Sequence, residues 1–197
     1  MALTALMKRP DQREDPEQKT PDTYINLYEA FRIEPKAFKV VASFLIKGSF
    51  SPHVVKGRSG TAIIEGVRNQ DEGDLAAQRF ANIYHTASLL RLGLLQQQCV
   101  HKLRILPALS PLALIIVMTL FDVAERHGCA AEAEMEEWLV ERVAKNFWGL
   151  VRKDGEAFSS VMESNIHFRM SVLDRLAGVR GRMEEESEDE NEDEDSE

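Results

Sequence analysis

A run of apolar residues in the middle of the chain constrains the fold more than any other feature. It follows Ser110-Pro111, a pair typical of a helix N-cap and first helical position, and it continues to Val123. The expected helix is apolar on nearly every side, so no face of it suits water. This pattern predicts a central helix surrounded by other helices. His127-Gly128 then supplies the cation and the glycine expected at a helix end.

The same region raises the question of a membrane span. A spanning helix needs about 20 apolar residues, whereas the stretch from Ile105 to Phe121 is shorter and includes Pro107 and Pro111. Charged residues from Asp122 onward continue the same helical pattern. We therefore expect a buried core helix and no membrane segment.

Charge is distributed very unevenly along the chain. The 197 residues carry a formal net charge of −9 and are 44% hydrophobic, enough for a sizeable core. Residues 184–197 contain 11 of the 33 acidic side chains and no basic one, which leaves 22 acids against 24 Lys and Arg in residues 1–183. The body is therefore close to neutral, at about +2, and the acidity belongs to the C-terminal segment.

Apolar residues at helical spacing predict further helices on both sides of the central one. Pro35 opens the first and Lys47-Gly48 ends it, and Asp74 is the expected N-cap of the second. Residues 49–74 read as a loop containing a short β-branched patch, Thr61–Ile64, that would need a partner strand; Tyr24–Tyr28 is another possible strand. The predicted fold is mainly α, with little or no sheet and about seven helices, over residues 35–47, 74–92, 94–106, 110–123, 131–153, 156–163 and 165–177.

Two segments carry a family resemblance. Residues 38–50 read Phe-Lys-Val-Val-Ala-Ser-Phe-Leu-Ile-Lys-Gly-Ser-Phe, and Ile83-Tyr84 is later followed by Cys99 and Leu103. In spacing and in the closing Gly-Ser-Phe, this resembles the C-terminal half of a BTB/POZ domain, a protein-interaction fold. The pattern of residues 143–176 is similar to the helical extension of many fungal BTB proteins. The resemblance implies a non-enzymatic adaptor subunit of a larger complex.

Composition, together with the resemblance, predicts a division of the chain. We expect a disordered arm over residues 1–22, a BTB-like helical region over 23–106, a helical extension over 107–178 and an acidic disordered tail over 179–197. The N-terminal half of the BTB fold, with its dimerisation helix and most of its sheet, has no counterpart before Tyr24. The chain is then a reduced relative, a shortened product, or a protein whose missing half comes from a partner. The choice between homodimer and hetero-complex stays open.

A missing half would leave apolar surface uncovered, and such surface marks a site of protein interaction. The candidate partner-binding residues are Phe44, Phe50, Tyr84, Leu90 and Trp148. The alternative is that these residues belong to the ordinary core.

The acidic segment supports a second hypothesis. Its acids could bind basic proteins, as in a nuclear chaperone-like or chromatin-associated protein, and Ser187 resembles an acid-directed phosphorylation site. The alternative is a tail that only aids solubility. The acids proposed to contact a basic partner are Glu184, Glu185, Glu186, Glu188, Asp189 and Glu190.

The sequence contains no pattern that indicates catalysis, a cofactor or a metal. The five histidines are scattered, Cys99 and His101 point in different directions on a helix, and Gly57-Arg58-Ser59-Gly60 lacks the Gly-Lys-Ser/Thr of a phosphate-binding loop. A near-neutral body with an acidic tail also argues against direct binding of nucleic acid. We expect no enzyme, no cofactor and no metal site.

The expected location is intracellular. Two cysteines are too few for a disulfide scaffold, and the N-terminal residues do not resemble a secretory signal. The protein would be nuclear or cytoplasmic, with the acidic tail favouring the nucleus.

Overall fold

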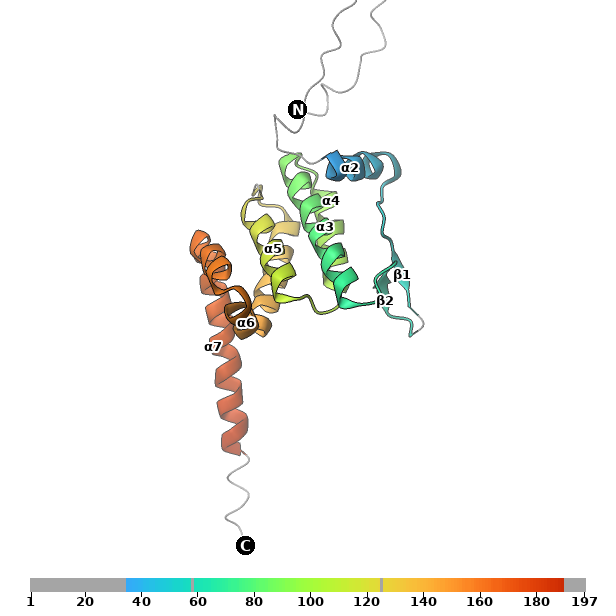
Figure 1. The fold of residues 1–197 in the computed structure, drawn as a ribbon. Coiled ribbons are helices and arrows are strands. Elements are labelled where there is room, and N and C mark those ends of the chain that lie inside the picture. Colours follow the sequence, from blue (N-terminus) through green and yellow to red (C-terminus); the bar gives the residue numbers. More distant parts are fainter. Residues whose placement is uncertain (1–34, 58, 125, 190–197) are drawn as a thin grey trace, which may run out of the picture.

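The computed structural model describes residues 35–57, 59–124 and 126–189, and it confirms a mainly α fold. The elements follow one another as a helical array with one small hairpin at its edge (Figure 1). Their bounds are α2 Pro35–Lys47, β1 Val54–Lys56, β2 Ala62–Ile64, α3 Gln70–Leu89, α4 Gly93–Ile105, α5 Pro111–Asp122, α6 Ala130–Ser164 and α7 Ile166–Asp189.

Helix α5 is the central helix that the sequence predicted. The Ser110 hydroxyl accepts a hydrogen bond from the Ala113 N–H at 3.2 Å, and Pro111 occupies the first turn. The helix packs against α3 on one side and α6 on the other (Figure 1). Its buried side chains are Ala113, Leu114, Ile115, Val117, Met118 and Phe121. Among the described helices, none combines the length and apolarity that crossing a membrane requires.

Helix α3 begins earlier than the sequence predicted. Its N-cap is Asn69, whose side chain accepts the Glu72 N–H at 2.9 Å, and not Asp74. The Asp74 carboxylate instead accepts the Ser110 N–H at 3.0 Å and so ties the first turn of α3 to the start of α5. Similarly, Gly93 begins α4 and does not end the preceding helix.

The segment predicted to be a loop contains a two-stranded antiparallel sheet. Residues 54–56 supply the partner strand that the β-branched patch needed, with Val55 opposite Ile63. Ile64 is buried, and β2 packs against α4, which gives the short hairpin a hydrophobic face. The predicted strand Tyr24–Tyr28 and the predicted N-terminal arm lie outside the described residues.

A kink divides α6 into the two helices that the sequence predicted there. Asp154 has φ −156° and ψ 70°, and its carboxylate accepts the Ala157 N–H at 3.2 Å, as an N-cap of the second half would. Edge-to-face packing of Phe147 on Phe158, with ring centroids 5.5 Å apart, holds the two halves together.

Helix α7 is longer than the helix that the sequence predicted over residues 165–177. Phe168 and Val172 are buried in the core, but the helix continues beyond Gly178 to Asp189. Its C-terminal part extends past the rest of the molecule (Figure 1). The Glu, Arg and Met residues of this stretch are strong helix formers, and no proline interrupts them. Residues 190–197 of the predicted disordered tail lie outside the described residues.

Candidate protein-interaction surfaces

The structure removes two of the five predicted contact residues from consideration. Phe50 and Tyr84 are 2% and 1% exposed and belong to the core, so neither ring offers a partner an exposed apolar surface. The Phe50 ring packs edge-on against Phe80 with centroids 6.1 Å apart, and the Tyr84 ring lies 6.1 Å from that of Phe121. Both are large aromatic residues that the fold needs for packing.

The other three predicted contacts do not form one surface. Phe44 on α2 and Leu90 at the end of α3 are partly buried against the core. Trp148 on α6 is 69% exposed, and its ring is nearly perpendicular to that of the adjacent Phe147, with centroids 5.3 Å apart. Because α6 lies on the opposite side of α3 from α2 (Figure 1), a single small partner segment would not contact all three residues.

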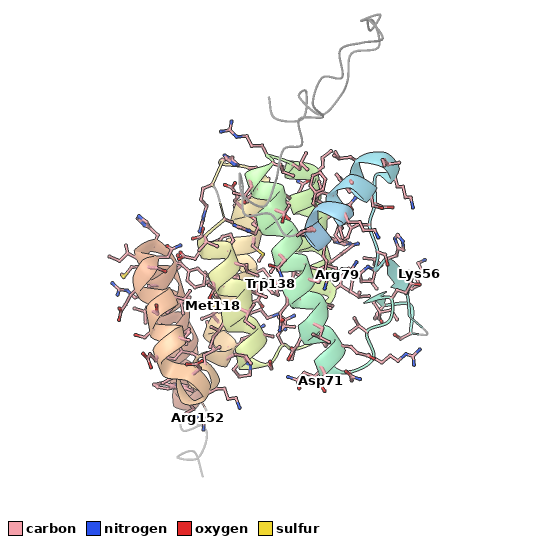
Figure 2. The ribbon with its side chains drawn as sticks, turned by 45° about the horizontal axis from the view of Figure 1, so that its top comes forward. Lys56, Asp71, Arg79, Met118, Trp138 and Arg152 are labelled. Atoms are coloured by element: carbon pink, nitrogen blue, oxygen red, sulfur yellow. The ribbon has the colours of Figure 1, made fainter. Side chains whose placement is uncertain are left out.

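A groove lies between α2 and α3, and one of the predicted contacts, Phe50, is among its lining residues. Its volume is about 690 Å³, and helix α2, Phe50-Ser51 and helix α3 form its walls. Three cations line it, Lys36 and Lys39 from α2 and Arg79 from α3, and its described lining contains no Asp or Glu. Figure 2 shows Arg79 on α3 beside α2. The remaining lining residues are Ala37, Val40, Ser43, Phe50, Ser51, Leu75, Gln78, Asn82 and Ile83.

A buried lysine holds the Phe50 wall of this groove in place. The Lys102 ammonium donates to the carbonyl oxygens of Phe50 and Pro52 at 2.6 and 2.8 Å, and it lies 3.4 Å from the centroid of the Phe50 ring. Burial lowers the pKa of Lys102 to about 8. Sequence reasoning missed this residue, because a lysine in the last turn of a helix is ordinarily a solvated cation.

Helix α7 exposes a second apolar stripe besides the one it buries. Ile166, Met170 and Leu173 are spaced as i, i+4 and i+7, and they are 57%, 51% and 43% exposed. This spacing places them along one face of the helix. The stripe is flat and carries no polar group that would orient a ligand, so it is less informative than the groove.

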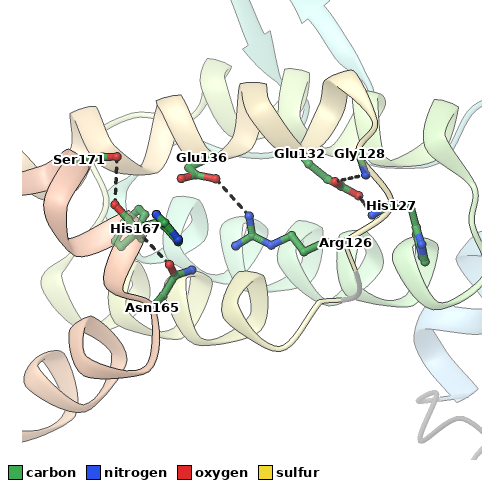
Figure 3. Close-up of polar contacts among 9 residues, drawn as sticks. Arg126, His127, Gly128, Glu132, Glu136, Asn165, His167 and Ser171 are labelled. Carbon is green, nitrogen blue, oxygen red and sulfur yellow. Dashed lines mark hydrogen bonds and ion pairs between the residues drawn. The ribbon is translucent and has the colours of Figure 1, made fainter.

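The polar contacts between α5 and α6 are structural. The Glu132 carboxylate accepts the N–H groups of His127 and Gly128 at 2.7 and 2.8 Å, and Arg126 pairs with Glu136 at 3.1 Å (Figure 3). Burial raises the pKa of Glu132, but hydrogen bonds from the N–H groups of His127, Gly128 and Cys129 lower it by more. The pKa of Glu132 therefore lies below its usual value. Glu132 therefore caps the start of α6 from its third residue.

The structure also places the cysteine and the histidine that lie close together in the sequence of α4. Cys99 is buried and His101 is exposed, so the two side chains do point in different directions along α4. Burial raises the pKa of the Cys99 thiol, which makes the thiolate needed for nucleophilic attack scarce. No three His, Cys, Asp or Glu side chains of the described part are grouped so that they could hold a metal ion.

The acidic residues predicted to bind a basic partner begin on α7. The C-terminal part of α7 contains Glu184, Glu185, Glu186, Glu188 and Asp189, together with Ser187. Glu190 lies outside the described residues.

Comparisons of the chain with protein-family models, curated proteins and solved structures found no match.

Proposed function

We propose that this chain is a non-enzymatic protein-interaction subunit, an adaptor of BTB-like type within a larger complex. The observation that carries the proposal is the groove between α2 and α3. Its lining combines apolar residues, including Val40 and Ile83, with residues that carry hydroxyl, amide and cationic groups. Sites that bind segments of other proteins typically combine an apolar centre with a polar rim.

The exposed side chains of the groove supply the contacts that a partner would use. Leu75 is 67% exposed on α3 and belongs to the groove lining, one turn before Arg79. An exposed leucine next to a concave surface gives a bound segment apolar area to cover, and the neighbouring arginine can orient it.

The hairpin supports a role for the partner in completing the sheet. The Glu65 N–H donates to the His53 carbonyl oxygen and the Gly57 N–H to the Thr61 carbonyl oxygen, so the hydrogen-bonded pairs are those of odd-numbered residues. The N–H and C=O groups of Val54 and Lys56 therefore face away from β2. A partner strand added at this edge would supply part of the sheet that the BTB resemblance lacks.

Quantitative affinity purification of the tagged full chain from cells that express it tests the adaptor role. Leu75→Glu with Arg79→Glu alters the groove, and Leu94→Glu is the control, because Leu94 is 73% exposed on α4 and lies outside the groove. We expect a defined set of proteins to be retained by the wild type and by the control and lost from the groove variant. Equal recovery from all three chains would remove the groove from the proposal.

A second candidate function follows from the extension of α7. Five of the acidic residues belong to the C-terminal part of α7, and this part of the helix extends past the body (Figure 1). The chain would then be a nuclear chaperone-like or chromatin-associated protein acting on basic partners. Removal of residues 184–197, or addition of a polyanion, would abolish binding in this case and would leave groove-dependent partners bound.

A further inference from the structure

We propose that the groove between α2 and α3 binds the acidic C-terminal segment, residues 184–197, of a second copy of this chain. This inference rests on the groove of the proposed function and names a ligand for it. It connects two features that lie far apart in the sequence: a groove whose described lining has three cations and no acid, and an acidic segment without cations.

Both walls of the groove, α2 and α3, contribute cations. Helix α2 carries three lysines and no acidic residue, and two of these lysines, Lys36 and Lys39, line the groove. They are three positions apart and therefore lie on the same face of α2. Arg79 provides a cation from the opposite wall, and all three side chains are exposed and able to pair. An acidic segment lying in the groove would meet positive charge on both sides.

Within this chain, residues 184–197 match that charge best. They hold 11 acids and no base in 14 residues, whereas residues 1–34 hold 7 acids and 5 bases. The N-terminal segment, although it leads directly into α2, has a net charge of only about −2 by this count. Opposite charge both steers the encounter and stabilises the complex, so the C-terminal segment is the favoured occupant.

Length and position indicate binding between copies. Helix α2 has 13 residues and is therefore about 20 Å long. The eight residues after Asp189 can span about 26 Å when extended, enough to follow such a groove. However, α7 leads the acidic segment away from the body on the side opposite α2 (Figure 1). The groove it meets is thus that of another molecule.

Such binding joins the tail of one copy to the groove of the next. The contact is head-to-tail, so self-association increases with concentration and decreases as salt screens the exposed charges. A partner that uses the groove must displace the acidic segment. Phosphorylation of Ser187 would add a charge of about −1.5 to −2 and strengthen the contact.

The test uses a fluorescein-labelled peptide of residues 184–197 and the chain that lacks them, with binding followed by fluorescence anisotropy. Lys36→Glu with Arg79→Glu reverses one cation on each wall. Lys56→Glu with Arg104→Glu makes the same charge change at exposed residues outside the groove. We expect the groove variant to bind the peptide at least about tenfold more weakly than the control variant. Peptide binding by the chain without substitutions should weaken by at least about tenfold between roughly 0.05 M and 0.5 M salt.

Other outcomes would overturn the proposal in distinguishable ways. Equal weakening by both variants would show a response to net charge alone. If the chain that lacks residues 184–197 and carries no substitution did not bind the peptide, the acidic segment would be excluded as the ligand. If this chain bound the peptide only after residues 1–33 were also removed, the groove would be assigned to the N-terminal segment. In each of these cases the adaptor function still stands or falls on the separate affinity purification with Leu75→Glu and Arg79→Glu.

The full chain provides the second readout. We expect sedimentation velocity to show concentration-dependent association of the wild type at low salt, and its loss on removal of residues 184–197 or on charge reversal in the groove. Association that survives both changes would contradict tail-to-groove binding.

Discussion

The Lys102 ammonium on α4 lies over the Phe50 ring at 3.4 Å and also donates to the Phe50 carbonyl oxygen at 2.6 Å. Two residues 52 positions apart are thus joined by a cation–π contact and a hydrogen bond at once. Phe50 is also one of the residues that line the groove between α2 and α3. The shape of the groove therefore depends on a lysine that does not line it.

Replacing Lys102 with Met should lower the free energy of unfolding by about 2 kcal/mol, because the buried carbonyl oxygens of Phe50 and Pro52 would lose their donor. Urea denaturation followed by circular dichroism measures the change. Lys56→Met is the control, since Lys56 is exposed and its substitution should matter by less than about 0.5 kcal/mol. Equal stabilities of the two variants would contradict the structural role of Lys102.

The stability contributed at Lys102 should also depend on pH. The pKa of the native amine is about 8 against 10.5 in the unfolded chain, so the unfolded chain binds more protons between these values. Stability therefore rises with pH in this window. Relative to Lys102→Met, the wild type should gain stability from about pH 7.5 to about pH 9.5. A constant difference would show that the carbonyl oxygens and the Phe50 ring keep the native pKa close to that of the unfolded chain.

Glu132 should contribute stability that is lost in acid. Its native pKa lies below the ordinary value of 4.5, so the contribution is complete above 4.5 and disappears as the pH falls through the native pKa. Glu132→Gln should lower stability by about 1 to 2 kcal/mol at neutral pH and by less in acid. Chemical denaturation at both pH values, with exposed Glu137→Gln on the same helix as control, measures this. A loss from Glu132→Gln that is equally large in acid would be inconsistent with the assignment.

Asp154 should stabilise the second half of α6 as an N-cap. Asp154→Ala removes the acceptor for the Ala157 N–H and should cost about 1 kcal/mol, whereas Asp154→Asn keeps an acceptor oxygen and should cost less. Thermal denaturation of the two variants separates these outcomes. If Asn were as destabilising as Ala, the charge and not the cap would be the important property.

The two tryptophans should differ in their contribution to stability and in their quenching by iodide. Trp138 is 5% exposed and Trp148 is 69% exposed, so Trp148→Ala should cost less than about 1 kcal/mol and Trp138→Ala about 3 to 5 kcal/mol. Iodide should quench Trp148 strongly in the Trp138→Phe variant. In the Trp148→Ala variant it should quench Trp138 weakly, and similar quenching of both residues would contradict their placement.

The sequence predicted best those elements whose signals are local. Ser110-Pro111 fixed the start of α5, and the all-round apolar pattern correctly predicted its central position. The start of α3 was missed because Gln70–Gly73 has no apolar periodicity, and the cap contact of Asn69 competes with an equally suitable Asp74. The choice between them depends on the Ser110 N–H, which lies 36 residues away and holds the Asp74 carboxylate.

The candidate site was predicted less well than the fold. The sequence does not reveal whether an aromatic side chain is exposed or buried. Trp148 and Tyr84 were therefore both plausible contacts, although only Trp148 is exposed. The groove combines residues of α2, the Phe50-Ser51 segment and α3, and no single stretch of sequence contains its pattern of cations. One signal was available: α2 has three lysines and no acid.

The helical extension of α7 has a consequence for local concentration. Twelve helical residues from Gly178 to Asp189 span about 18 Å, and a helix cannot turn back on itself as a flexible linker does. The effective concentration of the acidic segment at its own groove is therefore small, while that at a neighbouring groove follows the concentration of the protein. A flexible chain of the same composition would favour binding of the acidic segment to the groove of its own molecule. With this rigid spacer, occupancy of the groove depends on the concentration of the protein.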